Sequence, residues 1–215
     1  MNTGHLISFE GLDGAGKTTQ MALLEQWLLS HHISYVRTRE PGGTPLGTEI
    51  RQLLLHRPDL QITPLAEAFL FQADRAQHFA QLILPALAEG KLVITDRCFD
   101  ASIAYQGYAR GVGMELVERL SMLATQGCVP DLTILLYLDP SQVHARTDSS
   151  EDKSGQREEQ TRFDVESETF HRRVQEGFRL LARAHPERIK VVDASHSPEE
   201  IHKEIVMLVQ QLLAS

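Results

Sequence analysis

Cysteine, positive charge and long apolar runs are all scarce in this chain. Only two of its 215 residues are cysteines, Cys98 and Cys128, and they lack the CxxC spacing of redox or zinc sites. Reduced thiols in a cytoplasmic protein are therefore expected. The most apolar run, Leu132 to Leu138, is too short to cross a bilayer, and Met1 to His5 carries neither the charged nor the apolar region of a secretory signal. No membrane partner is expected.

Lysine and arginine are outnumbered by aspartate and glutamate, 21 to 29, which gives a net charge of −8. Binding along a nucleic-acid backbone needs clustered basic residues, so this class of partner is excluded. The basic residues instead stand singly, which suits a grip on a few phosphates of a small molecule. The length of 215 residues allows one α/β domain with a substantial core and is too short for two. We therefore expect a single domain over residues 1–215.

The segment from Gly11 to Thr18 has the complete P-loop pattern. Its residues are Gly11, Leu12, Asp13, Gly14, Ala15, Gly16, Lys17 and Thr18. The backbone N–H groups of such a loop cradle phosphates, the Lys17 ammonium reaches the outer phosphates, and the Thr18 hydroxyl can ligate Mg²⁺. A short apolar run precedes the loop and a helical pattern follows it, so the loop meets a helix N-terminus, where anions are favoured. The pattern predicts a nucleoside triphosphate and Mg²⁺; the competing interpretation is a glycine-rich turn that matches by chance.

Strand-like and helical segments alternate along the whole chain. The predicted strands are His5–Phe9, Ser34–Thr38, Leu92–Asp96, Leu132–Leu138 and Ile189–Asp193. The predicted helices are Lys17–Ser30, Leu46–Leu55, Pro64–Ala88, Glu115–Gln126, Glu166–Ala184 and Pro198–Leu213. This alternation predicts an α/β fold with a central, mainly parallel five-stranded sheet flanked by helices on both faces. Ligands of such sheets bind beyond the carboxyl ends of the strands.

Charged residues stand at those strand ends. Asp96 closes an apolar strand, where a carboxylate can hold Mg²⁺ as a Walker-B aspartate does, and Arg97 beside it offers a planar donor fork to a phosphate. The alternative is an Asp–Arg ion pair that merely finishes the strand. After the second strand, Glu40-Pro41-Gly-Gly-Thr44 lets backbone approach a ligand closely, although a simple turn would have the same composition.

One segment, Thr147 to Thr161, contains no apolar residue and cannot pack into a core. It is either a plain surface loop or a lid over the phosphate site. The base-reading Asn/Thr-Lys-x-Asp motif of switch GTPases is absent, and the second half of the sequence points instead to a phosphate acceptor.

Several motifs in order closely resemble thymidylate kinases of the bacterial type. They are the stretch Phe9 to Gln20, the stretch Thr38 to Thr44, Phe71-Gln-Ala-Asp-Arg75, Asp96-Arg97 through Gly107, the two arginines Arg157 and Arg162, and Val192-Asp193-Ala194. The resemblance covers essentially the whole chain. It implies a P-loop kinase with a short lid at about residues 146–162, transfer of phosphate from ATP to dTMP in dTTP biosynthesis, and a homodimer in which the helix Pro64–Ala88 is a candidate interface.

The resemblance also implies the acceptor site. Its substrate-binding residues would be Asp13, Glu40, Pro41, Arg51, Phe71, Arg75, Arg97, Ser102, Tyr105 and Gln106. Phe71 resembles the ring that stacks on thymine and Arg75 the donor to a thymine carbonyl, whereas burial statistics alone would place Phe71 in the core. Asp13 resembles the carboxylate at the 3′-hydroxyl, Arg97 the phosphate ligand, and Tyr105 the ring that excludes a 2′-hydroxyl.

Catalysis is expected from Lys17, Arg97 and the lid arginines Arg157 and Arg162. The P-loop position that is basic in one branch of the family is Gly14 here, which favours the branch whose lid supplies the charge. Arg157 is the preferred catalytic arginine; the alternative is that both lid arginines are merely solvated. The resemblance further implies that Asp193 and Ala194 hold adenine through their backbone.

The remaining features carry no chemistry of their own. The histidines lack ligand-like spacing and are expected at the surface or as helix caps, and Cys128 is expected to be buried and inert. Cys98 stands where the family usually has an aromatic residue. Two alternatives stay open: a kinase of another pyrimidine nucleoside or nucleoside monophosphate, and a non-catalytic nucleotide-binding switch.

Overall fold

A computed structural model describes residues 4–138, 161, 163 and 166–214. The lid expected at 146–162, with Arg157 and Arg162, lies outside the described residues. The five strands are β1 (Leu6–Glu10), β2 (Tyr35–Arg39), β3 (Leu92–Asp96), β4 (Leu132–Tyr137) and β5 (Ile189–Asp193). They form one sheet in the order β2-β3-β1-β4-β5, and every pairing is parallel. The predicted α/β class and five-stranded sheet are confirmed.

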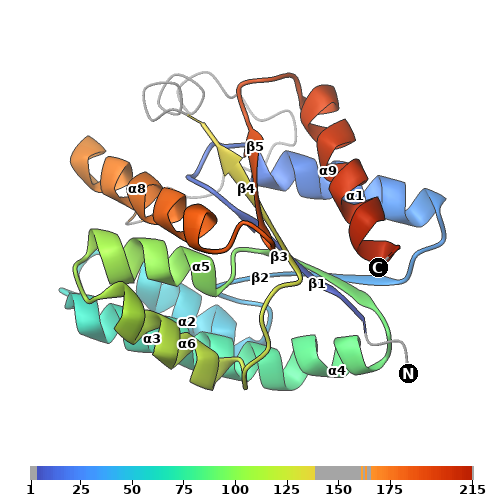
Figure 1. The fold of residues 1–215 in the computed structure, drawn as a ribbon. Helices are drawn as coiled ribbons and strands as arrows, with labels where there is room; N and C mark the ends of the chain where they lie inside the picture. Colours follow the sequence, from blue (N-terminus) through green and yellow to red (C-terminus); the bar gives the residue numbers. More distant parts are fainter. Residues whose placement is uncertain (1–3, 139–160, 162, 164–165, 215) are drawn as a thin grey trace.

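The helices connect successive strands. They are α1 (Lys17–Ser30), α2 (Pro45–Leu55), α3 (Pro64–His78), η1 (Phe79–Ile83), α4 (Leu84–Ala88), α5 (Phe99–Ser102), η2 (Ile103–Ala109), α6 (Met114–Ala124), α8 (Glu168–Ala184) and α9 (Pro198–Leu213), of which η1 and η2 are π-helical. α1 and α9 cover one face of the sheet, and the other helices cover the opposite face (Figure 1). None of the described helices is long and apolar enough to cross a membrane.

The central strand explains why the sheet is buried. Every residue of β1 is buried, since the strand pairs with β3 on one side and β4 on the other beneath both helical layers. The chain adds β2 and β3 on one side of β1 and then β4 and β5 on the other side, so the order of strands reverses at β1. Such a switch point opens a crevice at the carboxyl ends of the strands. Glu10, Arg39 and Asp96 end their strands at that edge.

Two helical predictions differ from the structure. The predicted helix Pro64–Ala88 is interrupted by the π-helical turn η1, because Pro85 has no N–H for the carbonyl four residues back. The helical segment Phe99–Ala109 was not predicted. All of its residues except Tyr108 are buried, so it shows no polar face and no helical period in the sequence. Of the other predicted elements, Lys17–Ser30, Leu92–Asp96, Ile189–Asp193 and Pro198–Leu213 have the observed bounds, and the rest differ by no more than two residues at either end.

Candidate active site

A cleft of about 370 Å³ opens beyond the carboxyl ends of β1, β2 and β3. Every predicted substrate-binding residue lines it, namely Asp13, Glu40, Pro41, Arg51, Phe71, Arg75, Arg97, Ser102, Tyr105 and Gln106. The P-loop residues Gly14, Gly16, Lys17 and Thr18 and the strand end Asp96 line it too. The loop therefore shares one cavity with the residues expected to hold an acceptor.

The P-loop joins β1 to α1 through glycines in left-handed backbone. Gly14 has φ 80° and Gly16, the residue that caps α1, has φ 94°, conformations that residues with a side chain rarely adopt. Within the described chain no side chain caps the N-terminus of α1, and its first turn contains no acidic residue. The unpaired N–H groups and the helix dipole thus favour an anion at this point.

Lys17 lies folded against its own loop. Its Nζ donates to the Leu12 carbonyl at 3.0 Å and to the Gly11 carbonyl at 3.3 Å, and it lies 3.4 Å from Asp13 Oδ1. The side chain is buried, with 6% of it exposed. A fixed ammonium at this depth adds a positive charge where the loop already favours phosphate oxygens.

Arg97 is the second cation of the cleft. Its Nη2 donates to Asp13 Oδ1 at 2.7 Å, and its guanidinium lies over the Tyr105 ring, 5.1 Å from the centroid. Burial alone would raise the pKa of Asp13, but the Arg97 and Lys17 cations outweigh it and hold the pKa well below its usual value. Among the described residues, Arg97 forms its ion pair with Asp13 of the P-loop and not with its neighbour Asp96.

The backbone of Arg97 is unusual. Its φ is 69°, in the left-handed region that non-glycine residues seldom occupy. The Arg97 N–H donates to the Phe9 carbonyl at 2.9 Å, which ties the turn after β3 to β1. This bend carries the side chain from the end of β3 to the P-loop.

Two oxygen groups beside the P-loop fit a magnesium ion. Thr18 is exposed to the cleft, and Asp96 Oδ1 is buried without a hydrogen-bond partner among the described residues. Mg²⁺ commonly uses one or two protein oxygens together with water and substrate phosphates. This pair has the donor chemistry expected for such a site.

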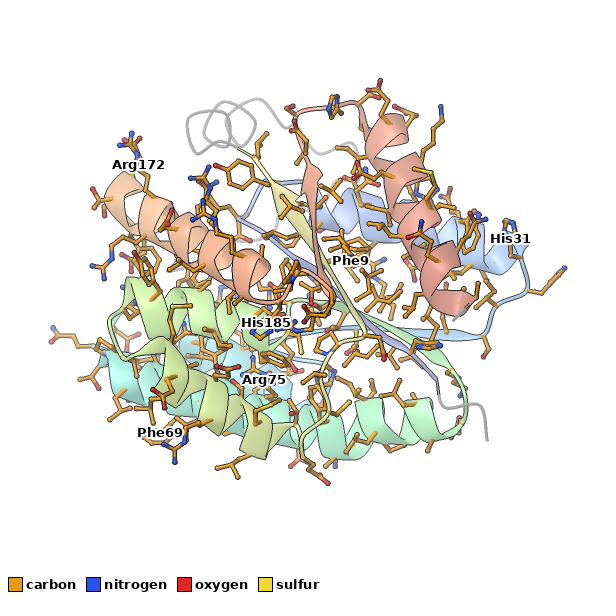
Figure 2. All side chains as sticks on the ribbon, viewed as in Figure 1. Phe9, His31, Phe69, Arg75, Arg172 and His185 are labelled. Atoms are coloured by element: carbon orange, nitrogen blue, oxygen red, sulfur yellow. The ribbon has the colours of Figure 1, made fainter. Side chains whose placement is uncertain are left out.

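The opposite end of the cleft holds a buried arginine. Arg75 is only 1% exposed and lies inside the molecule (Figure 2). Its Nε donates to Glu40 Oε2 at 2.9 Å, its Nη1 to Gln72 Oε1 at 2.9 Å, and its Nη2 to Ser102 Oγ at 3.0 Å. These bonds fix the guanidinium on every side except the one that lines the cleft, which suits a donor to the edge of a flat base.

Aromatic rings enclose the space beside Arg75. Phe71 is half-buried and lies 6.2 Å from the Phe163 ring, which in turn lies 5.8 Å from Tyr105. All three rings line the cleft. Phe71 therefore contributes to the core and to the cavity wall at once, so the two interpretations of this residue are compatible.

Two further predicted residues are held by neighbours. Gln106 Nε2 donates to the buried Glu67 Oε1 at 2.8 Å. Arg51 Nη1 donates to the Pro41 carbonyl at 3.1 Å, which links α2 to the loop after β2. That loop is more than a simple turn, because it lines the cleft and its Gly42 N–H donates to the buried Asp74.

Other predicted residues do not line the cleft. Gly11, Leu12 and Ala15 are the buried residues of the P-loop and face away from the cleft lining. Asp193 and Ala194 follow β5, where the Asp193 carboxylate accepts the Ser195 N–H at 2.8 Å. Their expected contact with adenine stays a prediction.

Several residues in or next to the site were not predicted from the sequence. His78 was expected at the surface or as a cap, which is wrong: its side chain is fully buried and contacts Glu40 and Thr38. A single histidine on the buried side of a helix gives no pattern that would reveal this. Cys98 and Phe163 also line the cleft. Cys128 is half-buried and not buried as expected.

Comparisons with known proteins agree with this geometry. The family model for thymidylate kinase matches residues 9–205. The chain is 46% identical over 207 residues to a thymidylate kinase of Symbiobacterium thermophilum, covering 96% of this chain and 93% of that one. It is 49% identical over 202 residues to a thymidylate kinase of Leifsonia xyli subsp. xyli, covering 94% and 92%.

A solved structure has the same fold. The crystal structure of thymidylate kinase from Ehrlichia chaffeensis superimposes with a TM-score of 0.74 at 32% identity, covering 96% of this chain and 99% of that one. The chain belongs to the thymidylate kinase family.

Proposed function

We propose that the protein transfers the γ-phosphoryl group of ATP to the phosphate of dTMP, forming dTDP and ADP, as a single domain. The observation that carries the proposal is the shared cleft of about 370 Å³, which is lined at one end by Lys17 and Arg97 and at the other by the buried Arg75 and aromatic rings. Triphosphate at one end and a pyrimidine at the other would bring two phosphates together between Lys17 and Arg97.

The reaction needs positioning and charge neutralisation more than covalent chemistry. The second pKa of a phosphate monoester is about 6, so the acceptor is mostly a dianion at neutral pH and needs no general base. What opposes the reaction is the repulsion of two anions that must align in line. Lys17 and Arg97 counter this repulsion, and the Asp13–Arg97 pair orients the guanidinium before an acceptor arrives.

Thr18 and Asp96 would hold Mg²⁺ beside the triphosphate. When bound, the ion supplies positive charge to the β- and γ-phosphate oxygens. The unpaired Oδ1 of Asp96 supports this assignment.

The lid arginines are proposed to supply the remaining positive charge at the transferring phosphoryl group. Gly14 leaves the P-loop without a basic residue at that position, so Arg157, with Arg162 as second choice, is proposed to reach the transferring group. Adenine is proposed to lie against the backbone of Asp193 and Ala194.

A homodimer is proposed through the face formed by α2, α3 and α6. These helices pack side by side, and each leaves large apolar side chains exposed. On α3, Leu65 is 47% exposed and Phe69 is 52% exposed. Phe69 lies at the outer edge of the molecule, away from the sheet (Figure 2). Exposed apolar side chains gathered on neighbouring helices favour an interface between two copies.

An acceptor assay tests the function. Formation of ADP is measured with dTMP, dUMP, thymidine or no acceptor, and dTMP is expected to give the highest kcat/KM. Preference for thymidine would overturn the acceptor assignment, and ADP formation independent of any acceptor would identify a nucleotide-binding switch. Lys17→Ala is the control that should lower turnover by orders of magnitude while the fold is kept.

A further inference from the structure

His78 joins three parts of the acceptor end of the cleft, although it does not line the cavity itself. The side chain is fully buried at the end of α3. Its Nδ1 lies 3.1 Å from Glu40 Oε1, and its Nε2 lies 2.6 Å from Thr38 Oγ1 at the end of β2. The imidazole thus connects the sheet to the loop that follows it.

Glu40 passes this connection on to Arg75. The two carboxylate oxygens have different partners: Oε1 faces His78, and Oε2 accepts from Arg75 Nε at 2.9 Å. Arg75 and Glu40 are buried alike, with 1% of each side chain exposed. A carboxylate that is held at one oxygen can still rotate about that contact. The contact of His78 with the second oxygen therefore fixes the orientation of the Glu40 carboxylate.

The hydrogen-bond chemistry fixes the tautomer. An ionised carboxylate only accepts hydrogen bonds, so Nδ1 of His78 must carry a proton toward Glu40. In the neutral ring, Nε2 then accepts from the Thr38 hydroxyl. In the protonated ring Nε2 would instead donate to that hydroxyl, so in both charge states Nδ1 is the donor toward Glu40.

Gly43, in the loop that follows β2, packs directly against the hydrogen bond between Thr38 and His78. Gly43 has φ +78°, and a Cβ there would lie 2.6 Å from Thr38 Oγ1 and 2.7 Å from His78 Nε2. The space around the imidazole is thus filled on the loop side, and the ring cannot shift without moving residues that line the cleft. This close packing distinguishes His78 from a histidine that merely fills the core.

We propose that His78 is a positioning residue for recognition of the pyrimidine: through Glu40 it locks the Arg75 guanidinium in the orientation that donates to the base. This inference rests on the proposed function, because the base is taken to be that of dTMP. His78 touches neither the nucleotide nor the reacting phosphates. Its effect is therefore expected on dTMP affinity and not on the ATP site.

Two substitutions separate the contacts of the ring. In asparagine the amide nitrogen is bonded to Cγ, as Nδ1 is in histidine, so His78→Asn keeps a donor toward Glu40. His78→Gln moves the amide one carbon further, toward the position of Nε2, and loses the donor toward Glu40. Kd for dTMP by calorimetry, KM for dTMP, KM for ATP, kcat and Tm are measured for both variants and the wild type.

We expect His78→Gln to raise KM and Kd for dTMP by several-fold to about tenfold, because a guanidinium that Glu40 no longer holds in place must be ordered when the base binds. Its KM for ATP should stay within about twofold of the wild type. His78→Asn keeps the donor toward Glu40 but loses the contact with Thr38, so it should recover part of the dTMP affinity. Equal dTMP constants in His78→Gln and the wild type, or equal losses for dTMP and ATP, would overturn the proposal. So would equal weakening of dTMP binding in both variants.

A second variant keeps the test decisive if His78→Gln does not fold. Thr38→Val removes the hydroxyl that fixes the ring while keeping the shape of the side chain. A raised KM for dTMP with an unchanged KM for ATP supports the proposal, and no change in either overturns it. Failure of the wild type to use dTMP would instead overturn the proposed function. The comparison of dTMP constants between the variants and the wild type tests the role of His78 alone.

Discussion

Replacing Arg75 by methionine is expected to lower the stability of the protein strongly, because the substitution leaves the Glu40 carboxylate buried without its cation. Both side chains are 1% exposed, and the Glu40 oxygen lies 2.8 Å from Arg75 Nη2 and 2.9 Å from Nε. Breaking a buried ion pair by removing one partner costs roughly 3 to 5 kcal/mol. For a chain of this size that corresponds to a fall in Tm of roughly 6 to 20 °C.

A double variant tests whether the cost arises from the uncompensated charge. Glu40→Gln combined with Arg75→Met removes both charges, so it should be less destabilised than the sum of the two single variants by about 1 to 3 kcal/mol. Urea unfolding followed by circular dichroism measures the free energy of unfolding of all four proteins. Glu40→Asp serves as the control that keeps the charge.

The pH dependence gives an independent check. Burial alone would raise the pKa of Glu40, but Arg75 and the His78 hydrogen bond outweigh it, so the folded-state pKa lies below the ordinary value of 4.5. The stabilisation from Glu40 is thus present above that value and is lost as pH falls through the folded pKa. The difference in the free energy of unfolding between the wild type and Arg75→Met should therefore become smaller at acidic pH. A loss below about 1 kcal/mol at neutral pH, or strictly additive single and double variants, would refute this reasoning.

Three further outcomes are expected. Burial and the nearby Glu40 raise the pKa of Asp74 to about 7, so the folded protein keeps a proton that the unfolded chain has lost. Stability should therefore fall by up to about 1.4 kcal/mol per pH unit as pH rises from about 4 to 7, and Asp74→Asn should reduce the slope in urea titrations by this contribution, leaving that of Glu10, whose pKa burial raises to about 8. Arg157→Ala should lower kcat by about a hundredfold or more with little change in dTMP Kd, and an effect confined to KM would transfer the catalytic role to Arg162. Phe69→Asp should shift the mass measured by light scattering from dimer to monomer, whereas an unchanged mass would exclude α3 from the interface.

Local chemistry explains what the sequence predicted well. The P-loop and the strand ends are recognisable because backbone-bound phosphate needs glycines at fixed spacing, and buried parallel strands read as short apolar runs. The cleft lining at Asp13, Arg97 and Arg75 matches the residues that the resemblance implied. These features depend on neighbours in the chain or on motifs of several residues.

What the sequence concealed depends on contacts between distant segments. The helical segment Phe99–Ala109 is buried nearly all round, so no polar stripe marks it. His78 pairs with Thr38 and Glu40, about 40 positions earlier, and nothing in its own neighbourhood distinguishes it from a surface histidine. Phe163 reaches the cleft only by packing against Phe71 and Tyr105. Such residues become recognisable only when the sheet and helices are assembled.

The left-handed turn at Arg97 has a consequence for protein engineering. A non-glycine residue in that conformation costs roughly 1 to 2 kcal/mol, so a screen that rewards heat resistance alone will favour glycine at this position. The same exchange would delete the guanidinium 2.7 Å from Asp13 and with it the proposed grip on the acceptor. Thermostable libraries of this scaffold should therefore hold Arg97 constant and seek their gains elsewhere, for example on the exposed faces of α8 and α9.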